Sequence, residues 1–251
     1  MRDYWVDLHI HTVLSPCGEL EMGAPEIVDA VRSAGIDIVA ISDHNSCDNF
    51  PAVAACAAGN PLVLPAIEVQ TAEDIHVLTI FPEYEAAHAF QRWLWERIRP
   101  IPNDPDVFGL QVVVDERNEI LRMEETLLLQ GAGYDIDTVV AKGHEAGAIV
   151  VLAHVDRPAF AYPAVLGPLA EDYPADAFEL SCRLAPAEAA EWRRRYPDRT
   201  FLRSSDSHSL EALRRENCTR MRLEAPAFEE IRLALAGSGG RGVAWPWEQT
   251  D

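Results

Sequence analysis

The chain has 251 residues, enough for a large hydrophobic core, and α/β barrels of about this size are commonly single domains. Its 21 Lys and Arg residues against 41 Asp and Glu residues give a formal charge of −20, and Lys142 is the only lysine. This composition argues against a broad basic surface for long nucleic acids. Small phosphorylated ligands, including nucleotides, stay compatible with it, because bound cations can supply local positive charge.

Five cysteines are present without any CxxC pair, and their odd number argues against a disulfide scaffold. The first residues enter a strand directly, with no signal-like segment, and no apolar run reaches the length of a membrane span. We therefore expect a cytoplasmic protein that does not bind membranes.

The first predicted strand begins at Tyr4 and ends in the sequence Asp7-Leu8-His9-Ile10-His11. Alternate side chains of a strand point to the same face. His9 and His11 can therefore reach one metal ion. A His-x-His pair alone is a weak signal, and the segments that follow strengthen it.

Those segments repeat the pattern of an apolar strand beside metal-binding residues. The predicted order is a helix over 25–35, a strand over 36–41 that runs into Asp43 and His44, a helix over 50–58, a strand over 62–67 that ends at Glu68, and a strand over 75–81 with His76 at its start. This β-α-β-α-β-β order predicts a mainly parallel sheet.

We interpret residues 84–134 as an insertion or small cap between two parts of a barrel, 1–83 and 135–251. The insertion begins with an amphipathic helix over 85–99, and three prolines then break the helical pattern. Residues 111–114 and 120–123 are predicted to pair as a hairpin. Since no metal-binding cluster lies in it, the insertion either shapes access to a site or only adds packing.

The α/β alternation resumes after the insertion. The predicted order is a helix that begins at 136 and ends near 147, a strand over 148–153 with His154 at its end, strands over 177–180 and 201–204, the latter running into Asp206 and His208, and a last strand and helix over 219–223 and 228–235. About seven strands with intervening helices predict a barrel, with an open doubly wound sheet as the alternative.

Nine side chains with metal-binding groups thus lie beside strand ends: His9, His11, Asp43, His44, Glu68, His76, His154, Asp206 and His208. In a parallel α/β barrel the carboxyl ends of the strands share one rim, so most of these groups would converge. Imidazoles and carboxylates without thiolate pairs suit Zn, Mn or Fe better than Ca or Mg. A carboxylate such as Glu68 can bridge two ions, and such a pair can generate hydroxide.

These motifs resemble those of the PHP (polymerase and histidinol phosphatase) superfamily. The resemblance rests on Asp7-Leu8-His9-Ile10-His11-Thr12, Ser42-Asp43-His44-Asn45, Glu68, His76, Ala153-His154 and Ser205-Asp206-Ser207-His208. It spans nearly the whole chain apart from the inserted middle. It implies a distorted (β/α)7 barrel with two or three divalent metal ions, Mn, Fe or Zn, that hydrolyses phosphoesters.

The resemblance also implies a ligand set. One ion would take His9, His11, Glu68 and Asp206, a second Glu68, His76 and His154, and a third His44 and His208. The family often adds a histidine or aspartate soon after the His-x-His pair, where this chain has Cys17 instead. Cys17 binds the third ion, Glu19 or Glu21 takes its place, or the third site is only weakly filled. Asp43 fits better as a residue that orients an imidazole than as a ligand.

Arginine suits phosphate because its guanidinium binds phosphate oxygens in pairs. We expect Arg157, three residues after His154, to bind the substrate phosphate and stabilise its charge. Arg183 either binds substrate as well or forms a surface ion pair. His44 or Asp206 would assist proton transfer.

The predicted function is a metal-dependent phosphoesterase that hydrolyses small phosphomonoesters or nucleotides by a metal-activated hydroxide. Within the same superfamily the alternatives are histidinol-phosphate phosphatase and short-oligonucleotide exonuclease. A metal-dependent amidohydrolase is an alternative from another class, although many of those enzymes bridge two metals through a strand-end lysine and Lys142 lies in a helical stretch. A non-catalytic metal-binding module is the other alternative.

Overall fold

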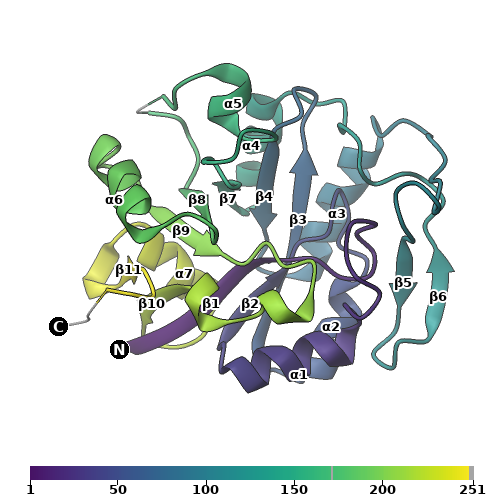
Figure 1. Ribbon diagram of the computed structural model, residues 1–251, viewed down its shortest axis with the longest axis horizontal. Coiled ribbons are helices and arrows are strands. Elements are labelled where there is room, and N and C mark those ends of the chain that lie inside the picture. The colour runs from purple at the N-terminus through teal and green to yellow at the C-terminus, as the bar shows by residue number, and fades with distance from the viewer. Residues whose placement is uncertain (171, 249–251) are drawn as a thin grey trace.

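The computed structural model describes residues 1–170 and 172–248. Its strands are β1 (Arg2–Ile10), β2 (Ile38–Ile41), β3 (Leu62–Gln70), β4 (His76–Ile80), β5 (Val112–Val114), β6 (Ile120–Met123), β7 (Ile149–Leu152), β8 (Ala177–Ser181), β9 (Phe201–Ser204), β10 (Thr219–Leu223) and β11 (Gly242–Ala244). Its α-helices are α1 (Ala24–Ala34), α2 (Phe50–Ala57), α3 (Tyr84–Trp95), α4 (Ile136–Glu145), α5 (Tyr162–Leu166), α6 (Pro186–Arg195) and α7 (Phe228–Leu235) (Figure 1).

The main sheet has the strand order β11-β10-β1-β2-β3-β4-β7-β8-β9 within the described ranges. Its two ends meet, because Ile10 at the end of β1 forms a parallel bridge with Ser207 just after β9. The backbone N–H of His11 donates to the Ser207 carbonyl at 3.0 Å across this junction. The seven strands from β1 to β9 in the main sheet therefore form a nearly closed, distorted barrel. This confirms the predicted barrel and excludes the open doubly wound sheet.

Strand β4 departs from the parallel arrangement, since it pairs antiparallel with both β3 and β7. Only residues 71–75 connect β3 to β4, whereas a parallel crossover needs about a dozen residues or more. The reversed direction of β4 determines where its first residue lies. His76, the first residue of β4, pairs with Gln70 at the last position of β3, so it lies at the rim that holds the carboxyl ends of the parallel strands.

Apolar residues of the barrel strands form one core cluster with α7, which includes Leu8, Leu64, Val151 and Ile231. A second cluster lies under α1 and α2, and a third under α3, α4 and α6. Two helices of the second half, α5 and α6, were not predicted. Helix α6 buries only Ala189 among its ten residues, so it carries no apolar periodicity.

The segment 84–134 contains α3 and the predicted hairpin, which β5 and β6 confirm. Helix α3 ends at Trp95, earlier than predicted, and buries Phe90 and Leu94 in a main core cluster. The hairpin stands at one side of the molecule, and β10 and β11 lie at the other (Figure 1). The division into barrel and insertion stays a prediction.

Among the described residues, no helix is both long and apolar enough to cross a membrane.

Candidate metal centre

The Glu68 carboxylate is the point at which the predicted ligands meet. Its Oε1 lies 3.2 Å from His9 Nε2, 2.8 Å from His76 Nδ1 and 3.2 Å from His154 Nε2, and its Oε2 lies 3.0 Å from His44 Nδ1 and 3.3 Å from His11 Nε2. Glu68 lies within β3, which continues to Gln70 rather than ending at Ile67 as predicted. Its backbone forms a parallel bridge with His44, so the loop after β2 is fixed to β3 at this carboxylate.

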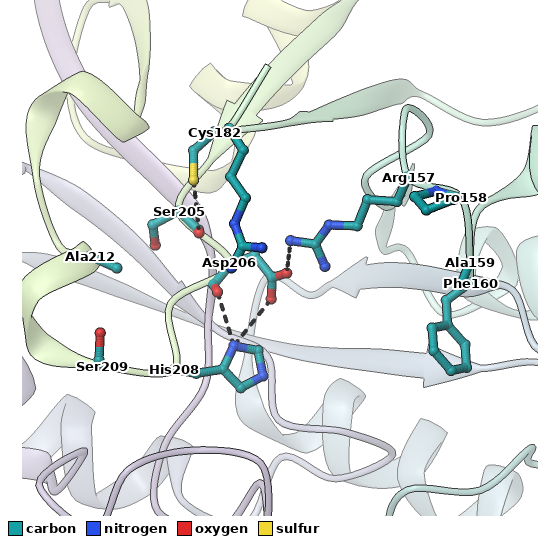
Figure 2. Close-up of a pocket in the computed structure, with 11 residues that line it drawn as sticks. Arg157, Pro158, Ala159, Phe160, Cys182, Ser205, Asp206, His208, Ser209 and Ala212 are labelled. Atoms are coloured by element: carbon teal, nitrogen blue, oxygen red, sulfur yellow. Dashed lines mark hydrogen bonds and ion pairs between the residues drawn. The ribbon is translucent and has the colours of Figure 1, made fainter. Parts of the chain in front are cut away.

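Asp206 forms a second meeting point, where Arg157 and His208 approach its carboxylate (Figure 2). Its Oδ1 lies 3.3 Å from His9 Nε2 and 3.2 Å from His11 Nε2, while its Oδ2 lies 2.5 Å from Nη2 of Arg157. His208 points at the same carboxylate, with 3.6 Å between its Nδ1 and Oδ1. Glu68 and Asp206 therefore both approach the Nε2 atoms of the same two imidazoles.

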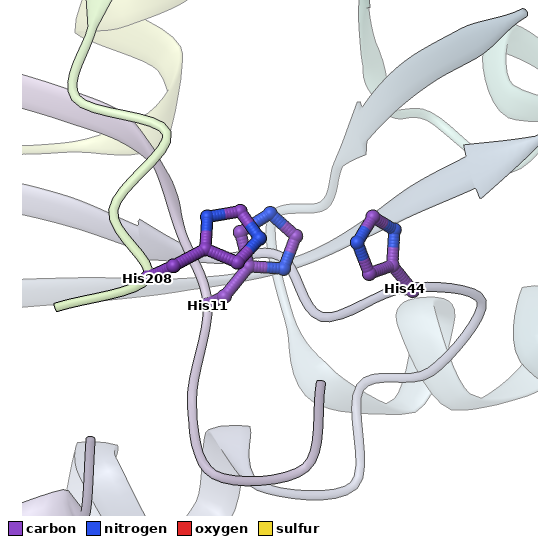
Figure 3. A group of neighbouring side chains, drawn as sticks. All are labelled: His11, His44 and His208. Carbon is purple, nitrogen blue, oxygen red and sulfur yellow. The ribbon is translucent and has the colours of Figure 1, made fainter. Parts of the chain in front are cut away.

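His11, His44 and His208 form a group of neighbouring imidazoles (Figure 3). Their donor atoms lie within 4.8 Å of one another, as do those of His9, His11 and Asp206 and those of His44, Glu68 and His76. Among the described residues, these three groups are the sets of three or more metal-binding side chains whose ligand atoms lie this close together.

Some buried polar atoms here have no aligned hydrogen-bond partner among the described residues: His76 Nε2 and His154 Nδ1 have none, and His44 Nδ1 and Glu68 Oε2 lie 3.0 Å apart without hydrogen-bond geometry. A buried polar atom without a partner is costly and calls for an explanation such as an ion. The set consists of imidazole nitrogens and carboxylate oxygens, which are ligands for divalent transition metals. The residues present therefore fit a divalent metal centre.

No model of a protein family matches the chain, and no curated protein matches it significantly. Among solved structures, the lesion-specific endonuclease Q of Pyrococcus furiosus matches with a TM-score of 0.71 and 18% identity over 96% of this chain and 58% of that one. A two-domain protein from Bacteroides vulgatus with a PHP-like metal-dependent phosphoesterase matches with a TM-score of 0.55 and 14% identity, over 97% and 65%. A metal-dependent phosphoesterase from Bifidobacterium adolescentis matches with a TM-score of 0.52 and 21% identity, over 81% and 87%.

This chain has the PHP fold. The likeness agrees with the order of the motifs along the sequence. The chain spans 58% of the length of endonuclease Q and 65% of the length of the Bacteroides protein.

Burial sets the protonation of two imidazoles at the candidate centre. It lowers the pKa of His44 to about 4 and that of His208 to about 3. Both rings are therefore neutral near pH 7 and offer a free lone pair, as a metal ligand must. Burial opposes protonation of His9 as well, but the Glu179, Asp206 and Glu68 carboxylates outweigh it and raise the pKa of His9 well above its usual value.

A buried carboxylate that the sequence analysis missed fixes the orientation of His9. Glu179 in β8 is 1% exposed, and its Oε1 lies 3.0 Å from His9 Nδ1. The same oxygen accepts a hydrogen bond from the backbone N–H of His154 at 3.2 Å. A carboxylate on one nitrogen of a histidine directs the other nitrogen to the metal. The available signal was a lone glutamate in the middle of the apolar strand 177–181.

Asp43 orients His11 through Ser15. The Ser15 hydroxyl donates to Asp43 Oδ1 at 2.6 Å, and it lies 2.9 Å from His11 Nδ1. Asp43 also accepts from the Thr12 backbone N–H at 2.7 Å, which ties the loop after β1 to the loop after β2. This is the orienting position expected for Asp43, with a serine placed between the two side chains.

Backbone conformation at the strand ends is strained. His154 and Asp206 adopt left-handed φ values of 28° and 47°, and Asn45, next to His44, adopts 52°. Non-glycine residues in this region cost about 1–3 kcal/mol each and cluster at functional sites. The pairing of β1 with β2 also shifts register between Asp7 and Ile10, the kind of irregularity that redirects side chains beside active sites.

Two pockets open onto the centre. The first, of about 330 Å3, is lined by Cys17, Glu68, His154 and Arg157 among others, and the second, of about 490 Å3, by Arg157, Arg183 and Asp206 among others. Cys17 thus lines a pocket at the site. It belongs to none of the three groups of closely spaced metal-binding side chains found among the described residues. Its role as a ligand stays a prediction, as does that of Arg183 in substrate binding.

Proposed function

We propose that this PHP-fold chain is a metal-dependent phosphoesterase that hydrolyses small phosphomonoesters or nucleotides. The supporting observation is the convergence of five imidazoles on the two oxygens of Glu68, with Asp206 facing two of the same rings. The converging side chains come from β1, β3 and β4 and from the loops after β2, β7 and β9. Such a carboxylate position is suited to bridging two cations.

The donor set supports two or three divalent ions, and its chemistry favours Mn, Fe or Zn. We assign one ion to His9, His11, Glu68 and Asp206, a second to Glu68, His76 and His154, and a third to His44 and His208 with Cys17. Ions bound there would supply an activated water and the positive charge that phosphoester hydrolysis requires.

Arg157 is the protein cation at the centre. It lines both pockets, and its ion pair with Asp206 holds the guanidinium beside the ligand cluster. We propose that its remaining N–H groups bind the equatorial phosphate oxygens, for which the fork geometry of arginine is suited. Asp206 and the neutral His44 lie beside the same pocket, and we assign them the proton transfers of the reaction.

The size of the pockets supports a small substrate. Volumes of about 330 and 490 Å3 are typical of small-molecule sites, and the two pockets share Arg157, Phe160, Asp206 and His208. A phosphate in the first pocket can therefore carry its organic part into the second. Arg183 lines this second pocket, where we propose that it contacts substrate. The formal charge of −20 also disfavours long nucleic acids.

Cleavage of nucleic acid is the second candidate, and the match to a lesion-specific endonuclease over 96% of this chain favours it. Histidinol-phosphate phosphatase and short-oligonucleotide exonuclease use the same kind of centre. The amidohydrolase alternative is weaker, because Lys142 forms an ion pair with Glu145 on α4 at 3.0 Å, whereas the imidazoles converge on Glu68.

The test is a substrate panel for metal-loaded protein: p-nitrophenyl phosphate, nucleoside monophosphates, histidinol phosphate, single-stranded and duplex oligonucleotides, and a chromogenic amide and lactone. We expect turnover of phosphomonoesters. Turnover of the oligonucleotides alone would establish the second candidate, and turnover of the amide or lactone without any phosphoester would refute the proposal.

A further inference from the structure

Phe160 is an exposed aromatic residue beside a cluster of charged groups. It lies in the loop between β7 and α5, is 43% exposed, and lines both pockets at the metal centre. In the second pocket it lies across from Asp206 and His208 (Figure 2). A single exposed hydrophobic side chain is common in proteins, so what distinguishes Phe160 is its position at both pockets beside the candidate ligands.

The loop holds Phe160 in place against a conformational penalty. Its φ of 57° is left-handed, a region that bulky side chains rarely adopt. The backbone N–H of His76 donates to the Phe160 carbonyl at 2.9 Å, which anchors the strained residue to the first position of β4. A strained residue that the surrounding structure fixes is a recognised feature of ligand-binding sites.

The ring of Phe160 stacks on the imidazole of His76, with 4.7 Å between ring centroids and 23° between ring planes. The rest of the phenyl surface is left for the pockets. The second pocket also presents cationic and hydroxyl side chains, namely Arg157, Arg183, Ser205 and Ser209. It therefore combines a flat apolar surface with groups that bind phosphate and sugar hydroxyls.

We propose that Phe160 is a stacking platform for a planar ring in the organic part of the substrate, and that the preferred substrates are phosphoesters of nucleosides. The inference rests on the proposed phosphoesterase function and specifies its substrate class. The phosphate occupies the first pocket beside Glu68, and the base lies on Phe160 with its sugar toward Ser205 and Ser209. Stacking of this kind accepts any base, because each base has an aromatic face.

The test compares Phe160→Ala with Phe160→Tyr, which keeps the ring. Substrates are AMP and UMP, which carry a base, and glycerol 2-phosphate, which has no ring. Base–aromatic stacking energies predict that Phe160→Ala lowers kcat/KM for the nucleotides by about 5- to 100-fold, mainly through KM. Glycerol 2-phosphate should change less than about twofold, and Phe160→Tyr should restore nucleotide turnover. Phe108→Ala is the matched control, since Phe108 is a 40% exposed phenylalanine in the loop before β5.

Adenosine provides a measurement that needs no catalysis. Saturation-transfer NMR should show contact of its base protons with wild-type protein and Phe160→Tyr, and a much weaker signal with Phe160→Ala. An equal loss of nucleotide and glycerol phosphate turnover in Phe160→Ala would overturn the platform, as would an unchanged adenosine signal. If wild-type protein hydrolyses no phosphoester, the proposed function fails, while the adenosine measurement still decides whether the ring binds a base.

Discussion

The Nδ1 atom of His9 lies 3.0 Å from Oε1 of Glu179, and both side chains are buried. This contact leaves Nε2 of His9 directed at Glu68 and Asp206. We predict that Glu179→Leu lowers the affinity for the first bound metal by about 10- to 100-fold, because the orienting carboxylate is lost. Calorimetric titration of metal into chelator-treated protein measures this. Glu85→Leu, an exposed glutamate in the first turn of α3, is the control. Equal affinities in the two variants would contradict an orienting role.

Replacement of the shared carboxylate should have a larger effect. We predict that Glu68→Gln loses at least one metal ion per chain and lowers phosphoester turnover by about 100-fold or more, since an amide bridges two cations poorly. Elemental analysis of purified protein gives the metal content. His88→Ala is the control, because His88 stacks on Tyr84 away from the centre. Full metal content and turnover in Glu68→Gln would refute the metal assignment.

Metal removal should destabilise the protein. Ions that bind only the native state at about 100 times their dissociation constant add about 2.7 kcal/mol to the free energy of unfolding. For a chain of this length this corresponds to a Tm increase of about 5–10 °C. Thermal unfolding with and without a chelator, followed by circular dichroism, measures the difference. A Tm that does not respond to added Mn or Zn would show that these ions do not bind the native centre.

The third ion depends on Cys17 in our assignment. We predict that Cys17→Ala holds one ion fewer than the wild type, whereas Cys56→Ala on α2 keeps the full number. Absorbance of the Co-substituted protein gives a second readout, because a thiolate ligand adds a charge-transfer band. Equal metal content in both variants and no such band would remove Cys17 from the ligand set.

The two arginines should differ in their effects. Arg157 contacts Asp206 at the centre, whereas Arg183 is exposed at the second pocket. We predict that Arg157→Ala lowers kcat by about 100-fold, consistent with loss of a charge-stabilising donor, and that Arg183→Ala mainly raises KM. Steady-state kinetics separates the two. A change in KM alone for Arg157→Ala would show that Arg157 binds substrate without assisting catalysis.

Most of the rim could be predicted, because each ligand follows or begins an apolar run that is long enough to indicate a strand. His9, His44, His154 and Asp206 all satisfy this rule, and the barrel brings them together. Glu68 was placed at the end of its strand, and the antiparallel direction of β4 was not foreseen. Residues 71–75 are too few for a parallel crossover, and β4 therefore runs antiparallel to β3.

Glu179 shows where prediction from one sequence stops. Its neighbours in β8 are apolar and its partner His9 lies 170 positions away. Nothing local distinguishes a buried carboxylate that orients a ligand from an isolated charge in a strand. Strand β11 and helix α6 were missed for a different reason, because β11 is short and α6 has few apolar residues.

The bridge between Ile10 and Ser207 has a consequence for synthesis of the protein. The His-x-His pair leaves the ribosome about 200 residues before Asp206 and His208. At a translation rate of about 5–20 residues per second, the two early histidines wait roughly 10–40 seconds for these partners. During this interval the nascent chain presents an incomplete chelate, so the full metal complement can be loaded only after β9 has emerged.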